Sequence, residues 1–514
     1  MKFNKCKFLS CSILVTNRTE NNHPRSYFFG LQFRLLSISI AMTAIAILCD
    51  CSKLVQVDSP PTSLTSDNIY SNDATAASVL TGLYTGMAKT SILWAENLNS
   101  IGLVSGLSSD ELTLYGAAAN GNAKLVQFYQ NHLNGGAANL SDPTIWKNLY
   151  ANLYIVNLAI ERLSGSTSLT PSVKQQLLGE ATFLRAFFYF YLVNLYGDVP
   201  LTTASNYQVN SKLSRSSSTD VYAQIIRDLK DAESLLSDYY VASDAKTRTS
   251  DRLRPNKWSA SALLSRVYLY TGDWVNAEVK ATEVINNKVM YDTVSVSNVF
   301  LKNSKESIWQ LQPVNMGWNT EDARAFIIPS SGPTSSSSVD GYPVYLSDNL
   351  INAFEPGDLR KDQWINSVVV NGNVRYYYPY KYKSASLNAT ITEYGTVLRV
   401  AEQYLIRAEA RAEQSKIDGA KNDLNSVRTR AGLPGTTAAD KNSLLPAIQQ
   451  ERQRELFTEW GHRWLDLKRT GKIDEWMPSV SPLKESTWSP NWKWYPIPQY
   501  DIIQNQNLQQ NLGY

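Results

Sequence analysis

The sequence predicts a mainly α-helical protein, in which tetratricopeptide-like pairs of helices frame an irregular, loop-rich half with short strands. Three observations predict this fold class. Apolar residues recur at helical spacing over most of the chain. Two segments share one helix-turn-helix layout of small residues, and two long zones lack the helical period. The chain, at 514 residues, is long enough to bury a large core.

The clearest helix covers residues 173–196. Its apolar residues repeat at spacings of four and three and form one stripe, made by Leu177, Ala181, Leu184, Phe188, Tyr191 and Leu195. Thr170 and Pro171 suit the start of this helix, and Gly197 suits its end. The same periodicity predicts helices at residues 74–87, 145–163, 221–236, 257–270, 274–285, 399–414, 417–431 and 444–459.

Two pairs of these helices share a layout of small residues. In residues 262–285 Gly272 marks the turn, and Ala277 follows five residues later. In residues 405–428 Ser415 and Ala420 stand in the same relative places. Small residues let two helices approach closely, as they do in tetratricopeptide repeats. Because the repeats are unevenly spaced, we expect a helical frame and not a regular array.

Two inserts of different character interrupt this frame, at about residues 97–142 and 290–396. The first is rich in Gly, Ala and Asn, whereas the second mixes strand-like alternation, turns and clustered aromatic residues. Within the second, the three tyrosines from Tyr376 to Tyr378 are expected to alternate across a strand. Loops on a rigid frame often carry function, so we expect the ligand-binding half here.

Residues 1–50 are interpreted as a signal peptide with an overlong N-terminus. The uncharged run 35–48 has fourteen residues, fewer than the ~20 that span a bilayer as a helix, and Arg25 and Arg34 provide a basic flank. The run ends at Cys49 and Cys51. Because residues 52–514 contain no cysteine, a thiolate metal site or a disulfide there gains no support.

A signal that stops on a cysteine resembles a bacterial lipoprotein signal, whose cysteine is acylated and becomes the first residue. Cys51 is the predicted lipidation site, because Leu48 and Cys49 suit the positions before it. Asp50 stands where a small residue is usual, so Cys49 and the absence of acylation stay as alternatives. The polar residues 51–70 would then be a lipid-anchored tether, and residues 71–514 the folded domain.

The charge balance gives no support for nucleic-acid binding. The formal net charge of +3 comes from residues 1–50, and the remaining chain has 43 basic and 44 acidic residues. Only three histidines occur in the whole chain, so a zinc site is not expected, and no cofactor is expected either. The 13 tryptophans and 29 tyrosines instead favour a ligand face.

Five blocks along the chain resemble the RagB/SusD family, the nutrient-binding outer-membrane lipoproteins of Bacteroidetes. The blocks are "GEATFLRAFFYFYLVNLYGDVPL", "RPNKWSASALLSRVYLYTGDW", "LRVAEQYLIRAEARA", "ERQRELFTEWGHRWLDLKRTGK" and the ending "WYPIPQYDIIQNQNLQQNLGY". They occur in the expected order, and the resemblance covers residues 51–514. Leu512 stands where the family commonly has proline.

The resemblance implies a surface-exposed lipoprotein of the cell outer membrane that acts with a SusC-like TonB-dependent β-barrel transporter. It implies capture of oligosaccharides, or in some members peptides, and their delivery to the transporter. It implies no catalytic residue and no organic cofactor, and it leaves open whether a structural Ca²⁺ is bound.

The block at residues 451–472 also invites an active-site interpretation. Glu455 and Glu459 would share one helix face, with His462 and Asp466 nearby, and two close carboxylates can act as acid and base. The alternative is that the neighbouring arginines neutralise these carboxylates in a structural network. We favour the structural network, and we expect no enzyme activity.

Aromatic residues on loops are the candidate ligand contacts, because the C–H faces of sugar rings stack on flat rings and sugar hydroxyls bond to polar side chains. The candidates in or beside the two inserts are Trp94, Asp110, Tyr115, Trp318, Asn319 and Trp364. Two rival functions remain, a secreted glycoside hydrolase and a helical-repeat scaffold that binds only protein. The sequence does not name the ligand.

Overall fold

The computed structural model describes residues 66–116, 122–134, 144–335 and 341–514. The signal peptide, Cys51 and most of the predicted tether therefore lie outside the described residues. Residues 66–514 separate from residues 1–65 as one compact unit. The hydrophobic core of the described residues lies within that unit, so we expect residues 66–514 to fold independently.

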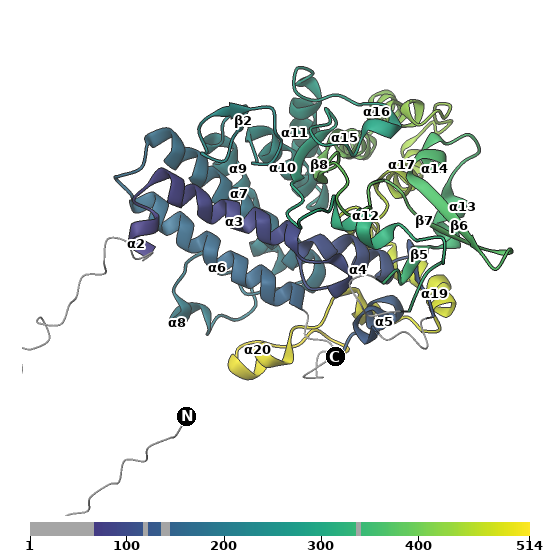
Figure 1. Cartoon of the computed structure of the whole chain (residues 1–514), viewed down its shortest axis with the longest axis horizontal. Helices are drawn as coiled ribbons and strands as arrows, with labels where there is room; N and C mark the ends of the chain where they lie inside the picture. The colour runs from purple at the N-terminus through teal and green to yellow at the C-terminus, as the bar shows by residue number, and fades with distance from the viewer. Residues whose placement is uncertain (1–65, 117–121, 135–143, 336–340) are drawn as a thin grey trace, which may run out of the picture. The chain divides into compact units, whose positions relative to one another are not determined.

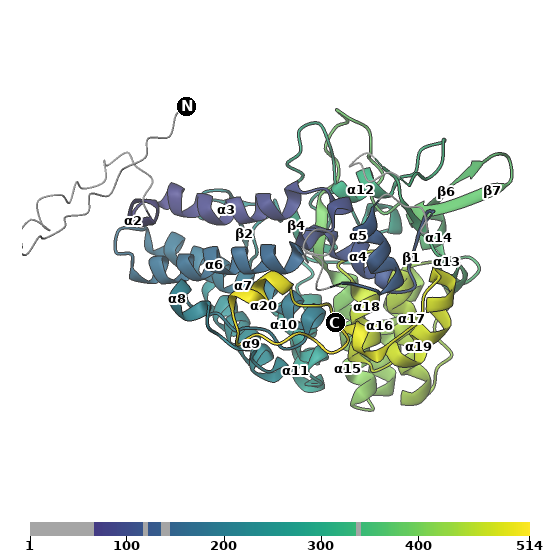
Figure 2. The same ribbon diagram turned by 90° about the horizontal axis from the view of Figure 1, so that it is seen from below.

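The frame consists of long helices that follow one another in the chain and pack side by side (Figures 1 and 2). Its helices are α3 (Asp73–Lys89), α6 (Thr144–Gly165), α7 (Pro171–Tyr196), α9 (Ser218–Leu235), α10 (Lys257–Tyr270), α11 (Trp274–Asn286), α15 (Val400–Glu413), α16 (Ile417–Arg430) and α17 (Lys441–Leu456). Each predicted helix is present, with its ends shifted by at most three residues. The predicted pairs are α10 with α11 and α15 with α16. The two helices of each pair pack against each other, and α11 also packs against α15.

Local sequence explains how these helices begin and end. Asn256 and Ser259 form a capping box at the start of α10, each side chain accepting from the other's backbone N–H. Pro171 is the first residue of α7, and Gly197 follows the helix with a φ of 76°. The prediction that α7 buries only a single apolar stripe is wrong, because the buried surface extends around the whole C-terminal part of the helix. Every residue from Ala186 to Tyr196 is buried, because α6 and α9 both pack against the helix.

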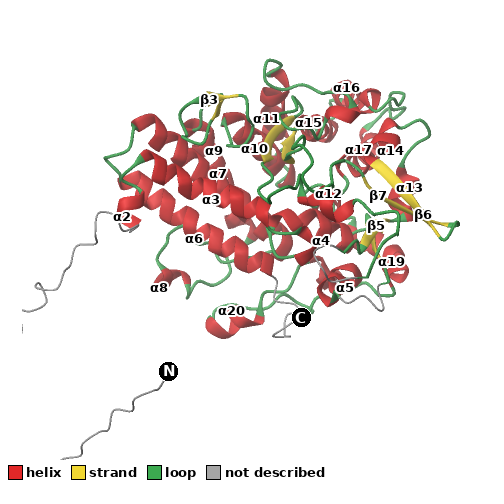
Figure 3. Ribbon diagram, in the orientation of Figure 1, coloured by secondary structure: helices red, strands yellow, loops and turns green. Residues whose placement is uncertain are grey.

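Shorter elements surround the frame (Figure 3). The helices are α2 (Ser66–Ile69), α4 (Ile101–Ser108), α5 (Ala123–Gln130), α8 (Tyr207–Asn210), α12 (Glu321–Phe326), α13 (Asp348–Ala353), α14 (Leu359–Trp364), α18 (His462–Arg469), α19 (Ile473–Val480) and α20 (Gln499–Gln504). The strands pair antiparallel in twos: β1 (Leu112–Leu114) with β5 (Val344–Leu346), β2 (Tyr240–Val241) with β3 (Arg248–Thr249), β4 (Ser307–Leu311) with β8 (Gly395–Arg399), and β6 (Ile365–Val370) with β7 (Val374–Pro379). Among the described residues, no helix has the length and apolar character needed to cross a membrane.

The two inserts are joined to the frame and to each other. Trp309 of β4 is completely buried and meets Phe183 and Phe187 of α7 edge to face, with centroids 5.1 and 5.2 Å apart. The pairing of β1 with β5 connects the first insert to the second. The first insert is more regular than expected, because all of Ile101–Ser108 forms a buried helix, α4. Figure 2 shows α12, β6 and β7 on one side of the frame and α11, α15 and α16 on the other.

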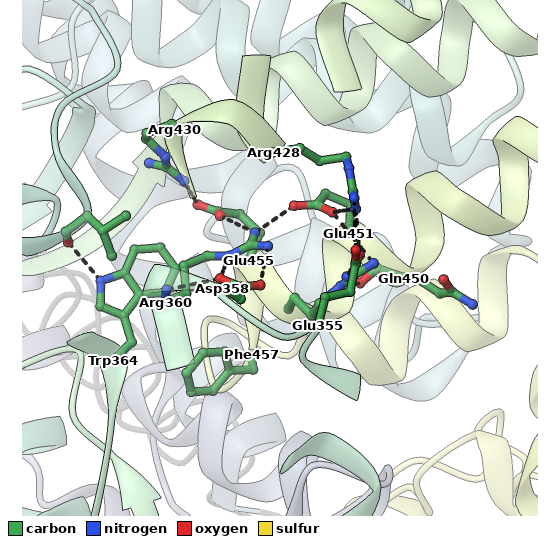
Figure 4. Close-up of polar contacts among 12 residues, drawn as sticks. Glu355, Asp358, Arg360, Trp364, Arg428, Arg430, Gln450, Glu451, Glu455 and Phe457 are labelled. Atoms are coloured by element: carbon green, nitrogen blue, oxygen red, sulfur yellow. Dashed lines mark hydrogen bonds and ion pairs between the residues drawn. The ribbon is translucent and has the colours of Figure 1, made fainter. Parts of the chain in front are cut away.

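Glu455 of α17 lies at the centre of a buried ion-pair network (Figure 4). Its carboxylate pairs with Arg360 of α14 at 2.8 Å, with Arg399 of β8 at 2.5 Å, and with Arg430 of α16. Burial disfavours the charge of Glu455, but the three guanidinium groups together hold its pKa well below the usual value. Four elements from separate parts of the chain therefore depend on one carboxylate.

The network continues through partners that are also buried. Arg360 pairs with Asp358 at 2.8 Å and with Glu451 at 2.7 Å. Arg399 also pairs with Glu459, at 2.7 Å, and Glu459 accepts from Lys381 at 2.5 Å. Each charge has an opposite partner, as buried charges require.

Replacing Glu455 with glutamine should lower the free energy of unfolding by about 3–5 kcal/mol, because three buried guanidinium groups lose their shared carboxylate. Urea denaturation of residues 66–514 measures this change. Glu475→Gln is the matched control, since its pair with Lys472 is largely exposed and should contribute under ~1 kcal/mol. Equal small losses in both variants would show that the network is not needed for stability.

Candidate ligand-binding site

Three tyrosines from the two inserts form a half-buried aromatic cluster. Tyr115 follows β1, Tyr345 lies in β5 and Tyr376 lies in β7. The ring centroids of Tyr115 and Tyr376 are 5.7 Å apart and those of Tyr345 and Tyr376 are 5.1 Å apart, both edge to face. The Tyr115 backbone N–H donates to Pro343 at 2.7 Å, which fixes the first insert against the second. We call this group the tyrosine cluster.

A second candidate region is the loop of residues 312–320, which carries Trp318. We call it the tryptophan loop. Arg324 of α12 lies over the Trp318 ring, 4.7 Å from its centroid, and leaves part of the ring exposed. Asn315 anchors the loop by donating to the Lys89 carbonyl at 2.8 Å and to Glu321 at 2.6 Å.

A neighbouring segment, residues 384–392, fastens the tryptophan loop. The Asn388 N–H donates to the Gly317 carbonyl at 2.7 Å. Gly317 has a φ of 78°, and a Cβ there would lie 2.6 Å from Asn388 Oδ1, so glycine is required at this turn. Met316 and Leu387 project from the two segments, and Met316 is 95% exposed.

Trp94 lies close to the tryptophan loop in the fold. It ends the short 3-10 helix η2 (Ile92–Trp94), which packs against α12. The Trp94 side chain is 48% exposed. Trp94 thus lies just before the first insert and Trp318 within the second, and both are close to α12, whereas Tyr115 lies in the separate tyrosine cluster.

The other three candidate residues are buried, so the expectation that they lie on an exposed face is wrong. Trp364 is completely buried, and its Nε1 donates to the Val296 carbonyl at 2.8 Å. Asn319 bonds to Ser384 at 3.0 Å and accepts from the Thr392 N–H at 3.0 Å, so it joins the loop to its neighbour.

Asp110 is a buried residue of the first insert and is held by the C-terminal helices. Its carboxylate accepts two bonds from Arg463, at 2.8 and 2.9 Å, and a third from the Trp476 Nε1 at 2.8 Å. Burial opposes the charge, but Arg463 and Trp476 keep the pKa of Asp110 below its usual value. Its function in this structure is to join α4 and β1 to α18 and α19.

A polar cavity of about 60 Å³ lies below the tryptophan loop. Asn99, Asn315, Asp322, Lys381 and Tyr382 are among its lining residues. Burial, followed by the charges of neighbouring carboxylates, raises the pKa of Asp322 to about 7, and burial lowers that of Lys381 to about 8. The lining thus carries polar groups below the tryptophan loop, although Lys381 already donates to Glu459 and to two backbone carbonyls.

The acidic block of the sequence does not form a free acid–base pair. Glu455 and Glu459 are bound by the arginines and lysine of the buried network. Asp466 pairs with Arg452 and Arg469, each at 2.7 Å. Burial and nearby guanidinium groups hold the pKa of His462 well below its usual value, so this histidine is neutral. Across the described part of the chain, no group of three or more His, Cys, Asp or Glu side chains is placed to hold a metal ion.

The sequence did not identify Tyr345, Tyr376 and Arg324 as site residues. Residues 376–378 lie in a strand as predicted, but only Tyr378 is buried, and Tyr376 and Tyr377 are both half-buried. Tyr376 meets Tyr115, which lies far away in the sequence, only because β1 pairs with β5 and β7 packs beside β5. The only signal in the sequence for Tyr345 and Tyr376 was the clustering of aromatic residues in the second insert.

Two family models match this chain. One, described as "Starch-binding associating with outer membrane", matches residues 65–269, and the other, the SusD family, matches residues 358–514. The chain belongs to the SusD family. In this SusD-like protein the first insert lies within the first matched range. The second insert begins between the two matched ranges and ends within the second.

Relatives and solved structures agree with this family. A SusD-like protein of Formosa agariphila is 24% identical over 93% of this chain and 99% of its own length. The starch-binding protein SusD of Bacteroides thetaiotaomicron is 23% identical over 70% of this chain and 76% of its own.

Solved structures show the same fold. A SusD superfamily protein from Bacteroides vulgatus has a TM-score of 0.72 at 19% identity, covering 86% of this chain and 99% of that one. A laminarin-binding SusD-like protein has a TM-score of 0.66 at 24% identity, covering 86% and 98%. The mainly helical fold with tetratricopeptide-like pairs is therefore shared with known SusD-like proteins.

The buried carboxyl of Glu111 should make stability fall as pH rises. Burial, followed by the charge of Asp110, raises the pKa of Glu111 from 4.5 to about 8. Folding therefore takes up a proton at Glu111 between these values, and the contribution of this group to stability is greatest below pH ~4.5 and is lost progressively up to pH ~8 as the carboxyl ionises.

Urea denaturation of the wild type and of Glu111→Gln between pH 5 and 8 tests this linkage. The variant should be the more stable at pH 8 and should lose less stability over the range, because its side chain stays neutral. Parallel pH profiles for the two proteins would contradict the assignment.

Proposed function

We propose that this SusD-like protein captures oligosaccharides on its loop-rich face and delivers them to a SusC-like TonB-dependent transporter. It is proposed to act at the cell surface, anchored in the outer membrane by a lipid on Cys51 after residues 1–50 are removed. It acts as a receptor and carries out no chemical step. The single observation that carries the proposal is that Trp94 and Trp318 present partly exposed indole rings beside α12.

The geometry of this face suits a sugar polymer. Indole and phenol rings offer flat apolar surfaces to the C–H faces of sugar rings, and the tyrosine cluster offers a second, separate group of such rings. Asn315 and the cavity residues Asp322 and Asn99 supply hydrogen-bonding groups for hydroxyls. Asn315 fastens the tryptophan loop to the end of α3, and the Tyr115 N–H fastens the first insert to the second. Little ordering of these segments is therefore needed when a ligand binds.

The comparisons support a glycan over other ligands. The names of related proteins and solved structures include a starch-binding protein, a laminarin-binding protein and surface glycan-binding proteins. These names do not assign one polymer to this chain. A screen of residues 66–514 against soluble oligosaccharides and peptides would identify the ligand class.

Alanine at Trp94 or Trp318 should weaken the binding of the oligosaccharide found in that screen by about tenfold, or ~1.4 kcal/mol, because a stacking surface is lost. Isothermal titration calorimetry measures the affinity, and circular dichroism checks the fold. Tyr207→Ala on α8 is the matched control, an exposed aromatic residue outside the loop-rich face. Unchanged affinity in the double variant Trp94→Ala/Trp318→Ala would refute the site.

The glycoside hydrolase hypothesis makes an opposite prediction. Its candidate carboxylates are bound by guanidinium groups, which favours the structural network. A hydrolase would release reducing sugar from the polymer that it binds, whereas a receptor returns the oligosaccharide unchanged. A protein-only scaffold would bind a partner but no oligosaccharide or peptide in the screen.

Mass spectrometry of the mature N-terminus separately tests Cys51, Cys49 and the absence of a lipid.

A further inference from the structure

Five large apolar side chains are exposed along one edge of the helical frame, remote in sequence from the loops of the proposed ligand site. They are Tyr154 of α6, Tyr207 and Val209 of α8, and Tyr500 and Ile503 of α20, with exposed fractions of 49, 74, 55, 68 and 65%. Figures 1 and 2 both show α8 and α20 beside α6. We call this group the apolar edge. So many large exposed apolar groups on neighbouring elements favour an interaction surface.

Specific hydrogen bonds hold the apolar edge in place. Trp146 of α6 donates to Asp501 of α20 at 2.8 Å. Beyond α20, Asn505 donates to the Leu213 carbonyl at 2.8 Å, and Asn507 donates to the Lys212 carbonyl at 2.7 Å. The segment after α8 and the segment after α20 are therefore joined, and the edge is a built part of the fold.

The apolar edge begins beside the place where the chain enters the folded unit. Near the end of α6, Ser166 donates to the carbonyl of Tyr70, which directly follows α2, at 2.9 Å. One and a half turns earlier, Glu161 of α6 accepts from Ser205 at 2.5 Å, just before α8. Tyr207 and Val209 are thus held at the same end of α6 as the first described residues.

The chain outside the described residues limits how far this end can lie from an anchor. Residues 51–65 separate the predicted lipidation site, Cys51, from Ser66, the first residue of α2. Fifteen residues span at most ~50 Å when fully extended. A lipid on Cys51 would therefore keep this end of α6 within ~50 Å of the membrane surface.

We propose that the apolar edge lies against the lipid surface in which the protein is anchored. Tyrosine suits this place, because its ring enters the apolar boundary while its hydroxyl stays at the headgroups. The five side chains carry no charge, so contact with lipid has no ionic desolvation penalty. Such contact would orient the anchored receptor on the membrane. The inference depends on the lipid anchor of the proposed function, but not on the identity of its ligand.

The test uses the absence of cysteine from residues 66–514, which lets one introduced thiol be labelled. Ile503→Cys and Tyr207→Cys carry an environment-sensitive fluorophore on the edge, and Val279→Cys carries it on α11 as an exposed control. An N-terminal histidine tag replaces the tether and holds each protein on vesicles of phosphatidylethanolamine, phosphatidylglycerol and a nickel-chelating lipid. Vesicles without protein partners exclude any contribution from a transporter.

The proposal predicts a blue shift of emission on tethering for the labels at positions 503 and 207 and none for the label at 279. Adding Tyr500→Asp should reduce the shift at position 503, because a charge then enters the lipid contact. No shift at either edge position, or an equal shift at position 279, would overturn the proposal. The lipid anchor is tested separately by the mass of the natural N-terminus, so the two failures can be distinguished.

Discussion

The pairing of Glu455 with three arginines is the constraint on which the C-terminal half of this structure depends. Arg360, Arg399 and Arg430 belong to α14, β8 and α16, which lie in separate parts of the chain and meet at Glu455 of α17. Removing water from these groups has a large free-energy cost, so the network is stable only when every partner is in place. This all-or-none requirement couples the second insert to the last helices of the frame.

The first insert is fixed to the same region by close packing. Gly102 of α4 lies against the turn after α17, where a Cβ would come within 2.3 Å of the Thr458 carbonyl oxygen. Thr458 and Trp460 both have positive φ values, which are rare for residues with side chains and persist only where the surroundings hold them. Asp110 adds its bonds to Arg463. The partly exposed rings of both inserts are therefore carried by a rigid interior, and the loops need little rearrangement to present them.

The sequence predicted local features well and long-range ones poorly. The frame helices were predictable because their periodicity and end signals are encoded within each segment. The prediction of Asp110 and Trp364 as exposed ligand contacts is wrong because the sequence does not show the distant partners that bury a polar or aromatic residue of an irregular zone. The Arg463 partner of Asp110 lies 353 residues away. The same limit hid the tyrosine cluster, since neither the pairing of β1 with β5 nor the packing of β7 beside β5 can be read from any one of these strands.

Hydrogen–deuterium exchange of residues 66–514, with and without a bound oligosaccharide, tests most directly whether a preformed loop-rich face captures the ligand. The account predicts slower exchange in residues 92–94, 312–326 and 384–392 and around Tyr115, Tyr345 and Tyr376, with the frame helices unchanged. Slower exchange spread through α7, α10 and α15 would show that binding orders the frame itself. Such a result, or protection confined to the helices, would contradict a preformed binding face on a rigid frame.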